Sequence, residues 1–313
     1  MNHTFTLDTN KFLHKLKLFM ALSRTPHGVV DMAAPVFAAL VWLGEFPSPG
    51  VTLLGLITLF AGYTTVYALN DIVDFNSDRK KAENGVFRNS QGDLDAVLVR
   101  HPMARGLIRY WEGVAWALAW GLVTILGAYT LNPVCVYIFL VAAGLEALYC
   151  LLWNVSPART LVSGIVKTSG AVAAIYGVDS SPSFLFVAVL FLFLFFWEIG
   201  GQNIPNDWTD LDLDGEFKAR TIPIALGLEL SSFMILCSSF AALVLSVFVL
   251  ITSKFHYGMI YVLLSLCAGG VFFIYPSIRL HRSPTRESAM ALFNRASYYP
   301  LVLLGIVLLK IIF

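Results

Sequence analysis

Charged residues are scarce in this chain. They make up 13% of its 313 residues, about half the share found in an ordinary soluble domain, whereas 58% of the residues are hydrophobic. So few charges do not cover the surface of a soluble domain of this size, which excludes an ordinary globular protein. The net charge of +1 forms no basic stripe, which argues against nucleic-acid binding. The remaining class is a protein that crosses the lipid bilayer several times.

Cysteine is also scarce. The four cysteines lie within apolar runs, and no two form a CxxC pair: Cys135, Cys150, Cys237 and Cys267. This pattern excludes a disulfide framework and a zinc site, and it predicts four small core residues. Residues 1–24 carry four basic side chains and no apolar stretch, so we expect no cleaved signal peptide there.

Long apolar runs, by contrast, are abundant. A membrane-spanning helix needs about 20 apolar residues, and Asn132-Pro133 divides one run that is too long for a single span. The predicted spans are 27–44, 48–69, 113–131, 134–153, 160–178, 183–203, 229–253, 257–278 and 296–313. The sequence therefore predicts an all-α polytopic membrane protein, a bundle of nine transmembrane helices that forms a single domain over residues 1–313.

The basic residues are distributed unevenly between the two sides of this predicted bundle. Eighteen of the 21 lysines and arginines, Arg88 among them, fall in the N-terminal segment and in the segments after spans two, four, six and eight. Cytoplasmic segments collect such cations. We therefore expect the N-terminus in the cytoplasm and the C-terminus outside. The two long polar segments, 70–110 and 204–221, then place the active site at the cytoplasmic face.

An acidic motif occurs twice in these polar segments. Residues 70–78 and 206–214 both read N-D-x-x-D-x-x-x-D, and together they hold six of the twelve aspartates. On a helix, spacings of three and seven residues place the aspartates of each set on one face. Such clustering is repulsive unless a cation neutralises it, and Mg²⁺ suits carboxylates combined with a substrate phosphate. The predicted metal ligands are Asp71, Asp74, Asp78, Asp207, Asp210 and Asp214; the alternative is a solvated acidic loop.

Nine spans with this motif after the second and sixth resemble the UbiA superfamily of intramembrane prenyltransferases. Residues 218–227 resemble the K-T-L-P-V-x-L-G stretch of the family, and Arg24-Thr25-Pro26 resembles its R-P before the first span. Residues 100–106 resemble its R-P-I-x-S-G, with His101 in place of the arginine. The chain departs from the family's Y-x-x-x-K on span four, because Tyr149 is followed by Trp153 where the lysine is expected.

The resemblance implies a Mg²⁺-dependent enzyme of a prokaryotic inner (plasma) membrane. It would transfer a prenyl group from an allylic polyprenyl diphosphate to a small-molecule acceptor, expected to be an aromatic quinone precursor, and release diphosphate. The catalytic residues it implies are Asn70, Asp74, Asp78, Asp210 and Asp214. The substrate-binding residues are Arg24, Arg79, Tyr149, Lys167, Asn206, Lys218 and Arg220, and Lys167 is hypothesised to replace the lysine missing from span four.

Other ionisable residues lie within the predicted spans, where charge is costly and therefore often functional: Asp31, Glu146 and Glu198. His27 is a candidate base for an acidic acceptor. Two other functions stay open at this point. Residues 214–220 partly resemble the motif of CDP-alcohol phosphotransferases, and clustered carboxylates also occur in cation-coupled transporters, although transporter sites usually lie near the bilayer midplane.

Overall fold

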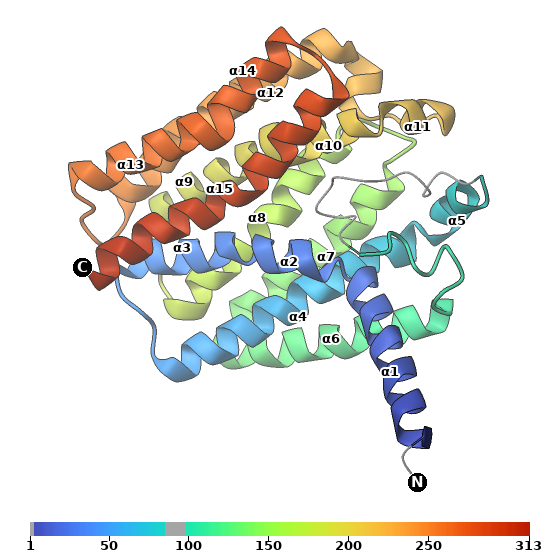
Figure 1. The fold of residues 1–313 in the computed structure, drawn as a ribbon. Coiled ribbons are helices and arrows are strands. Elements are labelled where there is room, and N and C mark those ends of the chain that lie inside the picture. Colours follow the sequence, from blue (N-terminus) through green and yellow to red (C-terminus); the bar gives the residue numbers. More distant parts are fainter. Residues whose placement is uncertain (1–2, 85–97) are drawn as a thin grey trace.

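Helices are the regular secondary structure of the described part of the chain. The structure, a computed structural model, describes residues 3–84 and 98–313, of which no residue lies in a strand (Figure 1). Arg88 and the rest of 85–97 lie outside the described residues. Nine helical segments in the described part are long and apolar enough to cross a membrane, which confirms the predicted fold class.

The spans consist of single helices or of helices joined end to end. They are α2–α3 (Thr25–Asp31, Ala33–Leu43), α4 (Pro49–Val73), α6 (Tyr110–Leu131), α7 (Pro133–Leu151), α8 (Arg159–Val178), α9–η3–α10 (Phe184–Trp197, Glu198–Asn203, Ile204–Thr209), α12 (Ile222–Thr252), α13–η4–α14 (Met259–Gly269, Gly270–Ile274, Tyr275–Arg282) and α15 (Arg286–Ile312). One of them begins earlier than predicted, at Arg286 instead of 296, whereas α12 is broken at Gly227 (φ 81°, ψ 164°), so its long part begins close to the predicted residue 229. A charge-free run marks the part in hydrocarbon, whereas the helix itself continues into the polar boundary.

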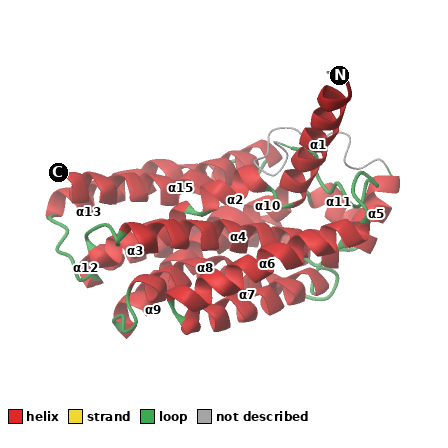
Figure 2. Cartoon of the chain, turned by 90° about the horizontal axis from the view of Figure 1, so that it is seen from below, coloured by secondary structure: helices red, strands yellow, loops and turns green. Residues whose placement is uncertain are grey.

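The helices lie alongside one another in a bundle, and α1 (His3–Leu22) projects from it (Figures 1 and 2). Helix α4 packs against α6, α7 against α8, α9 against α12, and α15 against α3. Large side chains such as Phe37, Phe193, Trp197 and Tyr299 fill the main core, and the Trp197 indole donates a hydrogen bond to the Ala296 carbonyl (2.9 Å). This packing fixes the orientation of α8, α9 and α15 around the interior.

Apolar side chains also cover the outside of the bundle, as expected for an integral membrane protein. Leu118, Leu122 and Leu126, for example, lie along the exposed face of α6. The prediction for the cysteines is correct for Cys135 and Cys150, which are buried, and wrong for Cys237 and Cys267, which are exposed. A helix that is apolar all round gives no periodicity to separate its lipid face from its core face.

The acidic motifs begin inside spanning helices and leave them at the same motif position. Helix α4 ends at Val73, and Asp74 joins it to α5 (Phe75–Glu83). Helix α10 ends at Thr209, and Asp210 joins it to α11 (Leu211–Glu216). The predicted continuous helical face is therefore interrupted at the middle aspartate in both motifs. Helices α5 and α11 lie at the end of the bundle opposite the C-terminus (Figure 1).

Candidate active site

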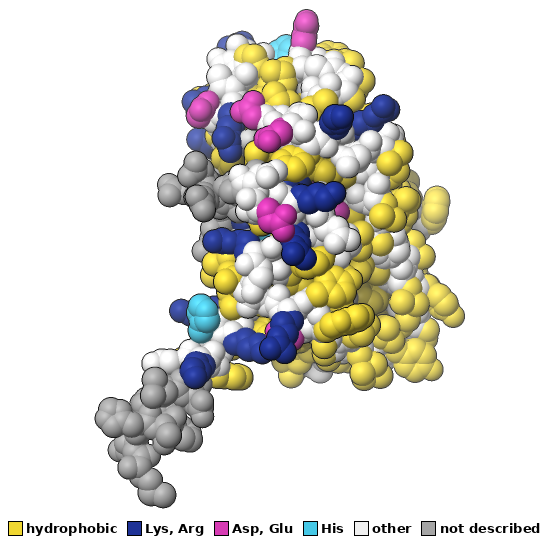
Figure 3. Space-filling view, turned by 90° about the vertical axis from the view of Figure 1, so that its right-hand side faces the viewer, with side chains coloured by type: hydrophobic (Ala, Val, Ile, Leu, Met, Phe, Trp, Pro, Cys, Tyr) yellow, Lys and Arg dark blue, Asp and Glu magenta, His cyan; other side chains and the backbone are white. Residues whose placement is uncertain are grey.

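The end of the bundle that carries α5 and α11 is its charged end. Figure 3 shows lysine, arginine and acidic side chains gathered there, with hydrophobic side chains covering the adjoining flank. Four motif carboxylates are buried behind this surface, Asp71, Asp78, Asp207 and Asp214, each less than a tenth exposed. Asp74 and Asp210, at the helix breaks, are partly exposed. Buried acids on four separate helices need positive charge or protons around them.

His101 provides positive charge for the first motif. Its Nδ1 lies 3.1 Å from Asp71 Oδ1 and 2.9 Å from Asp78 Oδ2. Burial opposes the charged imidazolium, but the two carboxylates outweigh burial and raise the pKa of His101 to about 9. Burial likewise opposes ionisation of Asp78, but His101 and Lys81 lower its pKa to about 2. His101 thus occupies a cationic position where the resemblance leads us to expect arginine.

Lys81 packs against Trp153, the residue that stands where the family resemblance leads us to expect a lysine. Its ammonium is 3.3 Å from Asp78 Oδ1 and 3.9 Å from the centre of the Trp153 ring, a distance typical of a cation–π contact. Lys81 also acts electrostatically on Asp74 and Asp214. The side chain that replaces the expected lysine on span four therefore supports a lysine from α5.

Arg159 provides positive charge for the second motif. Its guanidinium lies 3.9 Å from Asp207 Oδ1, packs over the ring of Tyr149 (4.1 Å to the ring centre) and donates a hydrogen bond to the Tyr149 hydroxyl. The amide of Asn203 donates to the same hydroxyl (3.1 Å). Arg100 lies at the same distance, 3.9 Å, from the partly exposed Asp210. Cations from α5, α8 and the segment before α6 therefore surround both motifs.

The second motif still has unused capacity for a cation. Asp207 Oδ2 is buried and has no hydrogen-bond partner among the described residues. Burial, together with Asp207 and Asp210, raises the pKa of Asp214 to about 7; burial and then Asp78 also raise the pKa of Asp74. An all-oxygen donor set with excess negative charge fits a hard divalent cation such as Mg²⁺.

Asn70 and Arg24 lie at the inner edge of the first motif. The Asn70 amide donates to Glu146 Oε1 (2.7 Å) and to the thiol of Cys150 (3.3 Å). Arg24 donates to Asn70 Oδ1 (3.1 Å) and lies 3.5 Å from Asp71. Its backbone is left-handed (φ 44°), as are those of His101 (φ 49°) and Lys218 (φ 56°), a costly conformation that concentrates at functional sites.

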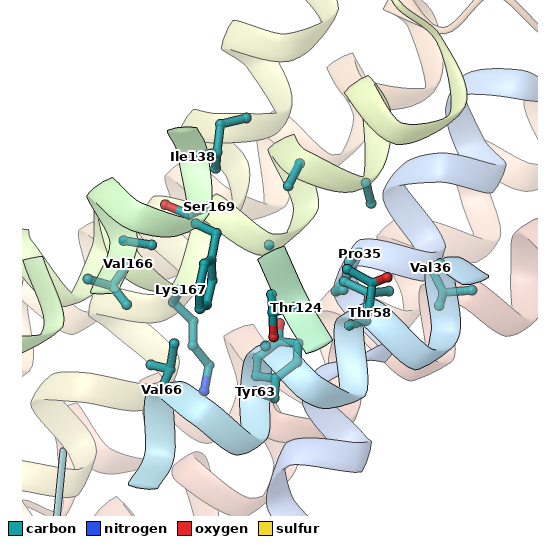
Figure 4. Close-up of a pocket in the computed structure, with 18 of the residues that line it drawn as sticks. Pro35, Val36, Thr58, Tyr63, Val66, Thr124, Ile138, Val166, Lys167 and Ser169 are labelled. Atoms are coloured by element: carbon teal, nitrogen blue, oxygen red, sulfur yellow. The ribbon is translucent and has the colours of Figure 1, made fainter. Parts of the chain in front are cut away.

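A cavity of about 390 Å³ begins beside these residues. Arg24, Asn70 and Asn206 line one end, and Phe46 and Pro47 line the other. Along α4 its wall runs from Asn70 to Val51, about 28 Å at the helical rise of 1.5 Å per residue. Most of this wall is apolar; Figure 4 shows Tyr63, Val66 and Thr124 around the interior, with Lys167 reaching into it from α8. Such a shape accommodates a long hydrocarbon chain with its head at the carboxylates.

The predicted substrate-binding residues fall into two groups. Arg24, Tyr149 and Asn206 adjoin the motifs or the cavity. Arg79 instead pairs with Glu83 (3.1 Å) and is 62% exposed. The side chains of Lys218 and Arg220 are exposed after α11. Lys167 lies deeper in the bundle than the motifs and is bonded to Asp31 (2.6 Å).

Lys81 and Arg159 were not predicted to belong to the site. Both counted only toward the cytoplasmic excess of cations, because their sequence neighbours show nothing of the tertiary contacts that bury them. One signal was available for Arg159: it directly precedes an apolar run, the place where an arginine at a span boundary can turn inward.

A nine-span bundle with a buried carboxylate site at the mouth of a long apolar cavity defines a membrane-embedded protein that handles a molecule with an anionic head and an apolar tail. The sequence profile of the UbiA prenyltransferase family matches residues 32–298. The chain therefore belongs to this family, as the motifs predicted, and the CDP-alcohol phosphotransferase interpretation is set aside.

Individual relatives agree with this assignment. The chain is 24% identical over 232 residues to a digeranylgeranylglyceryl phosphate synthase of Thermococcus sibiricus, which covers 74% of this chain and 76% of the relative. A UbiA homologue of Aeropyrum pernix shares the fold with a TM-score of 0.70, at 18% identity over 91% of this chain and 98% of that one. A homologue of Archaeoglobus fulgidus bound to DMAPP and Mg²⁺ gives a TM-score of 0.66, at 14% identity over 94% and 98%.

Proposed function

We propose that the protein transfers a prenyl group from an allylic polyprenyl diphosphate to an acceptor, with Mg²⁺, and releases diphosphate. The observation that carries this proposal is that both motifs meet the apolar cavity: their first residues, Asn70 and Asn206, line its charged end, and four of their aspartates are buried. The Archaeoglobus fulgidus homologues bound to DMAPP with Mg²⁺ and to GPP with Mg²⁺ support it.

The motif aspartates would hold Mg²⁺, with Asp207 and Asp214 as ligands whose negative charge the surrounding cations leave partly unneutralised. Bound there, Mg²⁺ supplies neutralisation of the negative charge that builds on the departing diphosphate. Arg24, Lys81 and Arg159 lie close enough to these carboxylates to bind diphosphate oxygens as well. The apolar cavity excludes water from the allylic cation that would otherwise be converted to an alcohol.

Two acceptor classes are compatible with this site. The family resemblance implies an aromatic quinone precursor, and this remains our first candidate because electron-rich rings readily attack an allylic cation. The likeness to a digeranylgeranylglyceryl phosphate synthase favours a second candidate, a glycerol-phosphate lipid. Both would be prenylated by the same donor chemistry, so the donor assay below serves for either.

The orientation in the membrane is also part of the proposal. We propose that the charged end, with the N-terminus, faces the cytoplasm of a prokaryotic cell and that the C-terminus lies outside. The concentration of basic side chains at that end supports this orientation (Figure 3).

The first experiment measures diphosphate release by the purified protein from dimethylallyl, geranyl and geranylgeranyl diphosphates, with a membrane lipid extract as the acceptor source. Release should require Mg²⁺, stop with EDTA, and fall at least about a hundredfold in Asp74→Asn and in Asp210→Asn, as expected when transition-state charge stabilisation is lost. Asp212→Asn is the matched control, because this exposed acid lies within residues 206–214 but at a position that the motif leaves variable. Folded protein that releases no diphosphate from any donor, but takes up ions, would indicate a transporter.

A further inference from the structure

A second group of ionisable side chains lies deeper in the cavity than the aspartate motifs. It consists of Asp31 on α2, Lys167 on α8 and Glu198 at the start of η3. The Lys167 ammonium lies 2.6 Å from Asp31 Oδ2 and 3.0 Å from the Tyr67 hydroxyl, which itself donates to Asp31. His27 Nε2 is 3.6 Å from the other Asp31 oxygen. Asp31 therefore already has a cationic partner, and Lys167 is already engaged.

Glu198 is only half satisfied by the protein. Its Oε1 accepts a hydrogen bond from the Ser163 hydroxyl (2.6 Å), whereas its Oε2 is buried with no hydrogen-bond partner in the part of the chain that the structure describes. The side chain is 5% exposed and belongs to the cavity wall. Leaving a buried carboxylate oxygen unpartnered is costly, above all at membrane depth. The oxygen is therefore available for a donor that the chain itself does not supply.

The local backbone also sets this position apart. Glu198 begins a π-helical stretch, Glu198–Asn203, within the span formed by α9 and α10. Such stretches are rare and frequently coincide with functional sites. Gln202 and Asn206, further along the same span, also line the cavity. Together with Glu198 they form a polar track, a row of polar side chains that leads to the second aspartate motif.

The cavity wall is thus divided between two kinds of ligand. Val36, Leu59 and Phe139 belong to its apolar part, which suits a prenyl chain. Hydrocarbon laid over Glu198 would leave Oε2 without a partner, so the prenyl chain is better placed against the apolar part. The polar track then faces a second molecule, and in a transfer reaction that molecule is the acceptor.

We propose that Glu198 binds a hydroxyl group of the acceptor, with the hydroxyl donating a hydrogen bond to Oε2. This inference rests on the proposed prenyl transfer. The charges around the site favour a neutral hydroxyl over an anionic group, because Asp31 and Glu198 face a single ammonium, that of Lys167, with His27 as the adjoining titratable group. Asp31, Lys167 and Tyr67 are positioning residues that hold α2, α4 and α8 around this pocket.

A hydroxyl of this kind is present both on a phenol and on a glycerol alcohol, and the experiment separates the two sources. The full-length protein with geranylgeranyl diphosphate and Mg²⁺ is given 1,4-dihydroxy-2-naphthoate or geranylgeranylglyceryl phosphate as acceptor. For each, the hydroxyl-blocked methyl ether is tested as a competitive ligand. The wild type should bind the hydroxyl form about tenfold or more tightly than its ether, and the acceptor that is prenylated identifies the source.

Glu198→Gln should raise the KM for the acceptor about tenfold and abolish the preference for the hydroxyl over the ether, with the KM for geranylgeranyl diphosphate unchanged. Thr168→Val is the matched control. Thr168 is buried on α8, outside the cavity wall, and its hydroxyl donates to the Gly164 carbonyl of the same helix (2.7 Å). It should leave both KM values unchanged. If Glu198→Gln does not fold, Ser163→Ala, which frees the other carboxylate oxygen, should raise the acceptor KM to a smaller extent.

Three results would overturn the inference: an unchanged acceptor KM in the folded variants, a wild type that binds ether and hydroxyl equally well, or release of diphosphate with neither acceptor prenylated. In the first two cases prenyl transfer persists, so the proposed function survives; in the third the donor is consumed without transfer to either acceptor, and a prenylated component of the lipid extract decides whether the proposed function survives. A wild type that releases no diphosphate from any donor would remove both.

Discussion

Trp153 occupies the position where the family resemblance leads us to expect a lysine, and its ring packs under the ammonium of Lys81. The charge is therefore present at the site but arrives from another helix. Lys167, hypothesised to replace that lysine, binds Asp31 below the motifs. The reason is physical: a charge can be relocated across a contact between helices, and nothing in the local sequence of either residue records that contact.

Lys81→Met should raise the KM for the prenyl diphosphate about tenfold, the usual effect of losing one hydrogen bond to a charged group. Adding Trp153→Lys to this variant should recover most of the loss, because it returns the ammonium to the span-four position. Donor saturation curves at fixed Mg²⁺ measure both effects. Lys80→Met, which removes an exposed cation beside Lys81, serves as the control; an equal loss in that variant would mean that only the overall charge matters.

Mg²⁺ binding should release protons from the second motif at acidic pH. Burial and the neighbouring aspartates raise the pKa of Asp214 to about 7 in the metal-free protein, so near pH 6 the carboxyl is mostly protonated and near pH 8.5 mostly ionised. A metal binds the ionised form and displaces the proton. Calorimetry in buffers of different ionisation enthalpy should detect this release near pH 6 and much less of it near pH 8.5. Asp214→Asn should abolish the difference; equal release at both pH values would contradict the assignment.

At the scale of elements, hydrophobic run length predicted the spans, and the proline break correctly separated α6 from α7. The helix breaks at Asp74 and Asp210 were not predicted, because both segments satisfy the spacing of a continuous helix. The π-helical stretch at Glu198 was also missed. It contains Gly200, where the neighbouring helix comes so close that a Cβ would lie 2.8 Å from Ser238 Cβ and 3.1 Å from the Ile235 carbonyl oxygen. Periodicity describes one helix, whereas these features arise where helices meet.

Gly200→Ala should therefore destabilise the protein by about 1–3 kcal/mol, the cost of forcing an extra methyl group into a packed contact. The contact includes backbone of α12, which cannot rotate away. Gly144→Ala on α7 is the matched control, because a Cβ there meets nothing within 4 Å, and it should stabilise the helix by up to about 1 kcal/mol. Thermal unfolding in one detergent compares the two; a Gly200→Ala protein as stable as the wild type would refute the close approach.

At the scale of the whole molecule, we propose that residues 1–313 form one domain, because the main core is shared by α3, α8, α9, α12 and α15. The cavity extends through this bundle, and its length should determine which donors fit. Gly62 and Gly55 both line it, about 12 Å and about 22 Å along α4 from Asn70 at 1.5 Å per residue. They provide a near and a far position on one wall.

Gly62→Leu should exclude geranylgeranyl diphosphate while it retains the dimethylallyl donor, because the added side chain obstructs the cavity close to the site. Gly55→Leu should affect only the longest donors, since a Cβ there projects into open space. The ratio of kcat/KM between short and long donors measures both effects. The same ratio in both variants would show that the chain takes another path.

The cavity joins a charged, water-facing end to an apolar interior, and this has a consequence for the direction of the reaction. Under the proposed function, diphosphate leaves at the charged end and is diluted in water, whereas the prenylated product partitions into lipid. The reverse reaction would require the two to meet again in one dry chamber. The two products therefore end on opposite sides of the boundary between water and lipid, and each turnover leaves an isoprenoid chain in the bilayer.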